Sequence, residues 1–340
     1  MLSRRQLAMG GLTLSLAPAT RAQGADFPRP GHPGRRMTIR GKQIYVEDAG
    51  PRDAPVVVYL HGGPGTGSYY FGLYQTERLS RSLRLIQFDQ RGALRSESVA
   101  PDEPFTIDDL VEDTEALRIA LGVPRWHVLS HSFAGLIAVR YGLAYPDAVQ
   151  SQIFDNVSFD IPASNQEQAR AFADIYRSQG KPEAAALAEQ FASELFDGME
   201  SFRKFNRLAN GLGFEARMRS FVHSLPDGYF MDWVTRSGLD IADWAKGGEA
   251  TAAIWRSGDG FIDMTRRLAE LRPPAVLLKG RYDHNTSQTQ IDAFRAANLG
   301  PVVMFEQSGH MPHAEEPDRY ADVVDHFIRE VGLKALEPGR

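Results

Sequence analysis

Residues 128–135 read VLSHSFAG, an apolar run that ends at a serine and continues into helix-forming residues. The run predicts a buried strand, and residues 133–145 predict the helix that follows it. A serine at such a sharp strand-to-helix turn needs small residues two positions before and two positions after it, because neighbouring backbone lies close there. Ser130 and Ala134 meet that need. The stretch therefore predicts a nucleophile elbow with Ser132 as the nucleophile.

A glycine-rich turn follows another predicted strand, the continuous apolar run at residues 56–60. The turn reads HGGPG at residues 61–65, and its glycines let backbone N–H groups point into a cavity with no Cβ in the way. The N–H groups of Gly63 and Phe133 are therefore expected to form an oxyanion hole. The alternatives are a tight turn that only positions the next helix, or a phosphate loop. A phosphate loop would need a following Gly-Lys-Ser/Thr, which this sequence does not have.

Two further polar residues follow late apolar runs, in the order acid and then histidine. They are Asp283 and His310. Parallel strands of an open α/β sheet bring such residues to one edge of the sheet. The order fits a catalytic triad of Ser132, Asp283 and His310. His313 is the alternative base, and His131 is expected to be structural because it adjoins the elbow.

Short β-branched runs alternate with helical segments along most of the chain, which predicts an α/β fold with a mostly parallel sheet and helices on both faces. From residue 159 to residue 266 the strand patterns disappear, and this part is expected to form an inserted helical cap. Residues 34–158 and 267–335 are expected to form the core. The sequence predicts strands at residues 37–40, 43–47, 56–60, 83–88, 126–129, 152–154, 275–279 and 302–305, and core helices at residues 107–121, 133–145, 288–297 and 318–331.

The first 22 residues resemble a twin-arginine export signal. Arg4 and Arg5 precede an uncharged stretch, and residues 20–22 offer a small-residue cleavage site. The stretch is too short and too rich in Gly and Ser for a membrane-spanning helix, which needs roughly 20 consecutive apolar residues. It predicts export by the twin-arginine machinery to the periplasm or the medium, without a membrane anchor. The alternative is an amphipathic N-terminus.

The composition is that of a globular protein, with 340 residues, 43% of them apolar and 24% charged. A net charge of −5 argues against a general nucleic-acid-binding protein. The sequence contains no cysteine, which excludes disulfides, thiolate metal sites and a cysteine nucleophile. The histidines lack the spacing of metal ligands, so we expect neither a metal nor an organic cofactor.

Further motifs are DQRG at residues 89–92, GRYD at 280–283, SGH at 308–310 and EEP at 315–317. With the elbow and the HGGPG turn, they resemble the motifs of the proline iminopeptidase-like serine peptidases, a family of α/β-hydrolases. The resemblance covers nearly the whole chain outside the signal and the cap. It departs in two places: Ala93 and Leu94 stand where the family usually has a glycine before Arg-Ser, and Ser130 and Ala134 replace the usual elbow glycines.

The resemblance implies an α/β-hydrolase fold and a serine hydrolase that acts on a small amide or short peptide through an acyl-enzyme. The implied type is an aminopeptidase or amino-acid amidase. In such peptidases acidic cap residues hold the free α-ammonium group of the substrate. The acids nearest the cap tryptophans are Asp232, Asp243 and Asp259, and we expect Asp259 to be the anchor, with Trp255 as a second substrate-binding residue. The segment around Asp259 also has the composition of a turn.

Two other functions remain open. The family's Trp/Glu-rich cap signature does not align with this sequence, which favours an apolar cap over an ester, a lactone or a carbon–carbon bond substrate. The other alternative is a non-catalytic binding protein on the same fold, which the complete triad disfavours.

Overall fold

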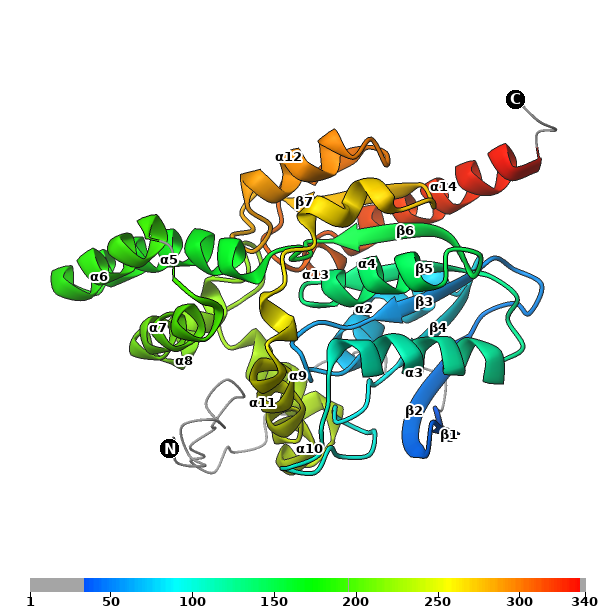
Figure 1. The fold of residues 1–340 in the computed structure, drawn as a ribbon, viewed down its shortest axis with the longest axis horizontal. Helices are drawn as coiled ribbons and strands as arrows, with labels where there is room; N and C mark the ends of the chain where they lie inside the picture. Colours follow the sequence, from blue (N-terminus) through cyan, green and yellow to red (C-terminus); the bar gives the residue numbers. More distant parts are fainter. Residues whose placement is uncertain (1–33, 195, 337–340) are drawn as a thin grey trace.

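The computed structural model describes residues 34–194 and 196–336, so the predicted export signal lies outside the described residues. Eight strands form one sheet in the order β1-β2-β4-β3-β5-β6-β7-β8 (Figure 1). β2 pairs antiparallel with both β1 and β4, and all other neighbours are parallel. The strands are β1 (Arg35–Ile39), β2 (Lys42–Ala49), β3 (Val56–Leu60), β4 (Arg84–Phe88), β5 (Trp126–His131), β6 (Val149–Asp155), β7 (Ala275–Gly280) and β8 (Val302–Phe305).

The central strands are buried on both faces, as continuous apolar runs require. In β3, Val58 and Leu60 belong to the apolar cluster that includes residues of α3, α4 and α12, whereas Val57 and Tyr59 belong to the cluster that includes residues of α2 and α14. Side chains that alternate along one strand thus reach two separate helical layers. The flanking helices are α2 (Tyr69–Leu79), α3 (Ile107–Ala120), α4 (Ala134–Ala144), α12 (Gln288–Ala296), α13 (Pro312–Glu315) and α14 (Pro317–Leu336).

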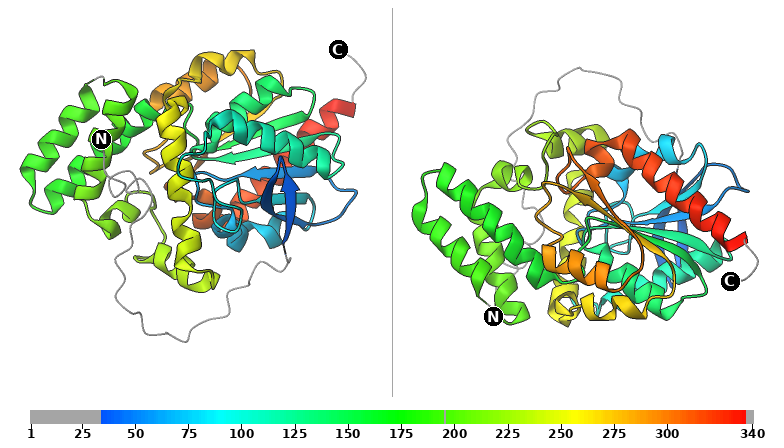
Figure 2. Two further views of the ribbon diagram at one scale, coloured as in Figure 1. Left: turned by 60° about the horizontal axis from the view of Figure 1, so that its bottom comes forward. Right: turned by 90° about the horizontal axis from the view of Figure 1, so that it is seen from above.

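Between β6 and β7 the described chain is helical. Figures 1 and 2 show α5 to α11 grouped beside one end of the sheet. A mostly parallel sheet with helices on both faces and inserted helices is therefore confirmed. The inserted elements are α5 (Ile161–Ser178), α6 (Pro182–Ser193), α7 (Gly198–Gly211), α8 (Phe214–Arg219), α9 (Tyr229–Ser237), α10 (Ile241–Ala245), α11 (Gly247–Ser257) and the 3-10 helices η2 (Asp259–Phe261) and η3 (Thr265–Glu270).

The inserted helices have apolar contacts of their own. Phe172, Phe191 and Phe205 join α5, α6 and α7 in one buried cluster. Trp233 of α9 stacks on Tyr70 of α2, with ring centroids 5.5 Å apart, and so attaches the insertion to the core. Across the described residues, no helix combines the length and apolar character that crossing a membrane requires.

Candidate active site

Ser132 occupies the turn between β5 and α4 in the left-handed region, with φ 59°. A non-glycine residue in this region is strained and needs support from its surroundings. The Ser132 N–H donates to the Asp155 carbonyl (3.1 Å), and the Ser132 carbonyl accepts from the Ser158 N–H (3.0 Å). An ideal Cβ placed on Gly62 would lie 2.7 Å from the Ser132 Cβ. The turn is therefore tightly held, with the glycine loop packed directly against the serine.

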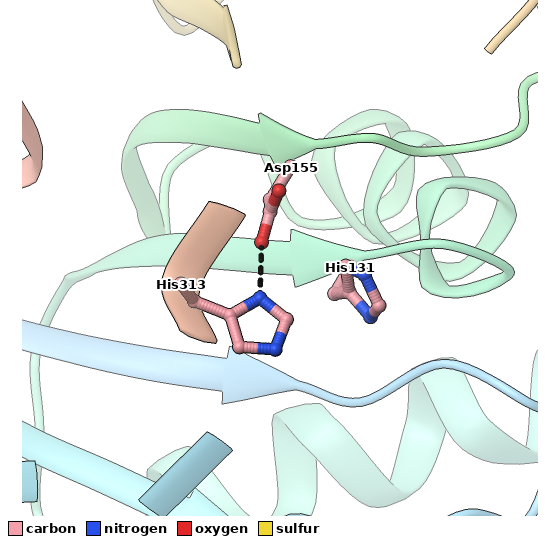
Figure 3. Close-up of side chains that lie close together, drawn as sticks. All are labelled: His131, Asp155 and His313. Carbon is pink, nitrogen blue, oxygen red and sulfur yellow. Dashed lines mark hydrogen bonds and ion pairs between the residues drawn. The ribbon is translucent and has the colours of Figure 1, made fainter. Parts of the chain in front are cut away.

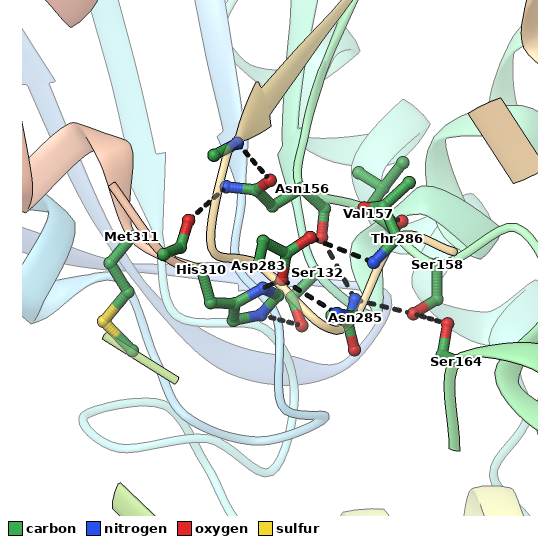
Figure 4. A network of polar contacts seen from close by, with 12 residues as sticks. Ser132, Asn156, Val157, Ser158, Ser164, Asp283, Asn285, Thr286, His310 and Met311 are labelled. Atoms are coloured by element: carbon green, nitrogen blue, oxygen red, sulfur yellow. Dashed lines mark hydrogen bonds and ion pairs between the residues drawn. The ribbon is translucent and has the colours of Figure 1, made fainter. Parts of the chain in front are cut away.

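The structure brings Ser132, His310 and Asp283 together from the turns after β5, β8 and β7 (Figure 4). The Ser132 Oγ lies 2.9 Å from His310 Nε2, and His310 Nδ1 lies 2.9 Å from Asp283 Oδ1. His310 is 4% exposed and Asp283 is 7% exposed. A carboxylate that accepts from Nδ1–H leaves the Nε2 lone pair directed at the hydroxyl. This arrangement can transfer the Ser132 proton to His310 as the oxygen attacks a carbonyl carbon.

Four hydrogen-bond donors surround the Asp283 carboxylate and stabilise its ionised form. Oδ1 accepts from His310 and from the Asn285 N–H (2.9 Å), and Oδ2 accepts from Lys279 Nζ (2.9 Å) and from the Thr286 N–H (3.0 Å). Burial alone would raise the pKa of Asp283, but Lys279 and His310 hold this pKa well below its usual range. Lys279 was not predicted from the sequence, although a lysine inside an otherwise apolar strand is itself a signal of a buried charge partner.

The Asn156 side chain joins the turns that carry the acid and the base (Figure 4). Asn156 Oδ1 accepts from the Gly280 N–H (2.9 Å), and Asn156 Nδ2 donates to the Gly309 carbonyl (3.3 Å). An ideal Cβ on Gly280 would lie 1.9 Å from the Gly309 oxygen, so only glycine fits at this crossing. Asn156 was not predicted from the sequence either, although this polar residue directly follows a buried strand.

Gly63 and Phe133 both line the cavity that contains Ser132. Among the backbone hydrogen bonds of the described residues, neither of their N–H groups has an acceptor. The predicted oxyanion hole requires two such unpaired donors beside the nucleophile.

Residues of the DQRG motif form hydrogen bonds with His61 and Ser68, on either side of the glycine-rich turn. The buried Asp89 carboxylate accepts from the Ser68 N–H (2.7 Å) and pairs with Arg95 (2.6 Å). The Gln90 amide donates to the His61 carbonyl (3.0 Å), and the Gln90 N–H donates to His61 Nε2 (2.9 Å). His61 at the start of the loop and Ser68 just beyond it are thus fixed to the turn after β4.

The glycine loop also meets α11 of the insertion, backbone against backbone. An ideal Cβ on Gly65 would lie 2.7 Å from the Gly247 Cα, and one on Gly247 would lie 2.2 Å from the Gly65 oxygen. The Thr251 hydroxyl donates to the Pro64 carbonyl (2.8 Å) one turn further along α11. The start of α11 is therefore seated on the loop that carries the predicted oxyanion donor.

A cavity of about 480 Å³ lies over Ser132 and His310, between the strand ends and the inserted helices. Its volume suits a small molecule or a short peptide. Its wall is largely aromatic and apolar, and five of the polar side chains on it are amides. The aromatic residues are Tyr70, Phe133, Phe202, Phe205, Phe214, Phe221, Tyr229, Phe230, Trp233, Trp244 and Trp255.

The structure does not bring Asp259 to this cavity, and the expected ammonium anchor is therefore corrected. The Asp259 carboxylate accepts from the Ile107 N–H (3.1 Å) and lies 3.6 Å from an arginine of α4. A carboxylate at the start of α3 is favoured by the exposed N–H groups there, which explains its position. Trp255 does line the cavity, whereas Asp232 and Asp243 do not.

His131, Asp155 and His313 form a buried cluster whose potential ligand atoms lie within 4.8 Å of one another (Figure 3). Both ring nitrogens of His131 already have partners, the Tyr70 hydroxyl at 3.2 Å and the His310 carbonyl at 2.9 Å. Burial lowers the pKa of His131 to about 3. A neutral histidine with both nitrogens occupied favours a hydrogen-bonded support for the His310 backbone over a metal site.

His313, the alternative base, belongs to the same cluster. Its Nδ1 lies 3.0 Å from Asp155 Oδ2, and burial lowers its pKa to about 3. Burial raises the pKa of Asp155 to about 6. The structure therefore pairs Ser132 with His310 and places His313 in the supporting network.

Comparison with known proteins gives consistent matches. A family model described as alpha/beta hydrolase fold matches residues 55–317. The chain is 27% identical to a proline iminopeptidase of Heyndrickxia coagulans over 297 residues, covering 85% of this chain and 94% of the relative. It is 29% identical to a proline iminopeptidase of Neisseria gonorrhoeae, covering 84% and 92%. The crystal structure of a proline iminopeptidase-related protein from Thermus thermophilus superposes with a TM-score of 0.70 and 24% identity, covering 90% of this chain and 99% of that one.

Proposed function

This chain belongs to the alpha/beta hydrolase fold family, and on that premise we propose that it is a serine hydrolase of the aminopeptidase type. Its substrate is a small amide or a short peptide, and the reaction proceeds through an acyl-enzyme. The observation that carries the proposal is the pair of 2.9 Å contacts that link Ser132 through His310 to Asp283. The similarity to proline iminopeptidases over most of the chain supports the aminopeptidase type.

In the proposed mechanism, His310 removes the proton of Ser132 as its oxygen attacks the substrate carbonyl. Asp283 orients the ring and stabilises the imidazolium, because its carboxylate stays ionised. The N–H groups of Gly63 and Phe133 stabilise the tetrahedral oxyanion, and one such donor is worth roughly 3 kcal/mol of barrier. His310 then protonates the leaving amine, and it activates the water that releases the acyl group.

An esterase is the second candidate, because the cavity wall is largely apolar and contains no carboxylate among the described residues. The 4-nitroanilide and the 4-nitrophenyl ester of alanine, and the same pair for proline, distinguish the two. We expect both members of a pair to be hydrolysed because both form the same acyl-enzyme, with the ester faster because 4-nitrophenolate leaves more readily than 4-nitroaniline. Steady-state kinetics measure this. Rapid ester turnover with no anilide turnover above buffer would favour the esterase.

We also propose export through the twin-arginine machinery, supported by Arg4 and Arg5 ahead of an uncharged stretch. Replacing both arginines with lysine is expected to leave most of the protein as precursor in the cytoplasm. Cell fractionation and N-terminal sequencing measure this, and Arg21→Lys serves as the matched control. Undiminished export of the double variant, or an exported protein that begins at Met1, would contradict the proposal.

A further inference from the structure

Arg217 of α8 lies on the wall of the active-site cavity, and among the described residues no other lysine or arginine and no carboxylate does so. Its Nη1 donates to Asn210 Oδ1 at 3.3 Å. Within the described chain, it forms no ion pair. Burial lowers the pKa of Arg217 without an opposing contribution from a carboxylate. The guanidinium nevertheless stays charged at any ordinary pH, because its pKa starts far above neutrality.

A cation in this setting lacks compensation. Arg217 is half-buried, and a neutral amide such as that of Asn210 satisfies one N–H group but does not balance the charge, so the partial removal of the guanidinium from water is uncompensated. Arg219, two residues along the same helix, is different: it is exposed, lies 3.6 Å from Asp227 and donates to a backbone carbonyl. Of these two arginines of α8, the one on the cavity side therefore has no carboxylate partner among the described residues, whereas the other has one.

Neighbouring amide side chains on the wall add hydrogen-bond donors beside Arg217. Asn206 and Asn210 are four residues apart on α7 and both line the cavity, as neighbours on one helix face do. Because Asn210 Oδ1 accepts from Arg217, the Asn210 NH₂ group is available as a second donor beside the guanidinium. A guanidinium with flanking donors complements a planar carboxylate, which it binds through two parallel hydrogen bonds. Among the residues that the structure describes, this wall offers an ammonium group no carboxylate.

We propose that Arg217 binds a carboxylate of the substrate, so that the enzyme selects short peptides or amides that carry an anionic group. The inference rests on the proposed hydrolase function and specifies its substrate class. Two positions on a substrate can supply the carboxylate. One is the free C-terminus of the peptide that leaves, and the other is an acidic substituent on the acyl part.

Two matched substrate pairs test the inference and distinguish the two positions. Alanyl-phenylalanine and alanyl-phenylalanine amide differ only in the C-terminal carboxylate. N-succinyl-alanine and N-succinamoyl-alanine 4-nitroanilides differ only in a carboxylate, replaced by a neutral amide, on the acyl side. In at least one pair, we expect the carboxylate member to have a kcat/KM about tenfold or more above that of the neutral member.

The variants Arg217→Met, Arg217→Lys and Arg219→Met give the residue-specific readout. Arg217→Met should bring the ratio within each pair to about one, Arg217→Lys should retain part of the preference, and Arg219→Met should retain all of it. Calorimetric titration of the same compounds into Ser132→Ala protein, with and without Arg217→Met, measures the binding preference without turnover.

A preference below about twofold in both kinetics and titration would overturn the inference, as would a preference that Arg217→Met leaves unchanged. Failure of the hydrolase function has a separate signature, since the wild-type protein would then neither turn over any substrate nor react with a fluorophosphonate. The titration would still decide whether Arg217 binds the carboxylate.

Discussion

Replacement of Ser132 by alanine is expected to lower kcat by about a millionfold, because no other group can form the acyl-enzyme. The same variant should lose all covalent labelling by a fluorophosphonate, which reacts with the activated serine of the wild-type protein. Turnover of alanine 4-nitroanilide and intact-mass spectrometry measure the two effects. Thermal unfolding should show a folded protein, since the change removes only one oxygen from a half-buried side chain.

Ser193→Ala, at an exposed position on α6, is the matched control and should leave labelling and turnover as they are. Equal labelling of Ser132→Ala and the wild-type protein would show that the reactive serine lies elsewhere in the chain. A reduction in kcat of less than about tenfold would also contradict the assignment of Ser132 as the nucleophile.

Lys279→Met is expected to lower the free energy of unfolding at pH 7 by about 3–5 kcal/mol, because it leaves the buried Asp283 carboxylate without its cationic partner. Lys279 is 5% exposed, and its Nζ also donates to the Asp283 carbonyl at 2.6 Å. Urea denaturation followed by circular dichroism measures the loss. Lys204→Met removes a half-exposed lysine that lies 3.0 Å from Glu200 and over the Phe196 ring, and this control should cost about 1 kcal/mol.

The difference between wild type and Lys279→Met should shrink in acid. The pKa of Asp283 is lowered in the folded wild-type protein, so the stabilisation from its ionised form is present above the unfolded pKa of about 4. It is lost progressively as the pH falls from there towards the folded pKa. The variant loses the part of this dependence that comes from Lys279, while His310 still lowers the pKa of Asp283. A difference that stays constant from pH 7 to about pH 3 would contradict this account of the Lys279–Asp283 pair.

The sheet was predictable because its central strands are buried on both faces and therefore read as unbroken apolar runs. The helix α2 was not predicted. Its buried face includes Gly72, Gln75 and Thr76, so it lacks the aliphatic periodicity that indicates a core helix. The amide of Gln75 donates instead to the carbonyls of His313 (2.7 Å) and Pro317 (3.0 Å), contacts that depend on the distant C-terminal segment.

The positions of Ser132, Asp283 and His310 in the fold were predictable for a related reason. Each residue follows a strand, and parallel strands present their carboxyl ends at one edge of the sheet. No such geometric rule predicts which cap side chains face the cavity, because the direction of a side chain there depends on how the helices pack together. Asp259 therefore looked like a substrate residue in the sequence, but its carboxylate binds the first N–H of α3. Arg217 gave no signal before its position in the cavity was known.

The backbone contact between Gly65 and Gly247 limits how this enzyme can be recombined with its relatives. Two segments 182 positions apart in the numbering have to remain complementary, because a Cβ on either glycine would collide with the backbone of the other. Their substitutions should therefore covary. A chimera that receives a foreign cap should also need the foreign loop at residues 61–67, since the two segments form a single exchangeable unit.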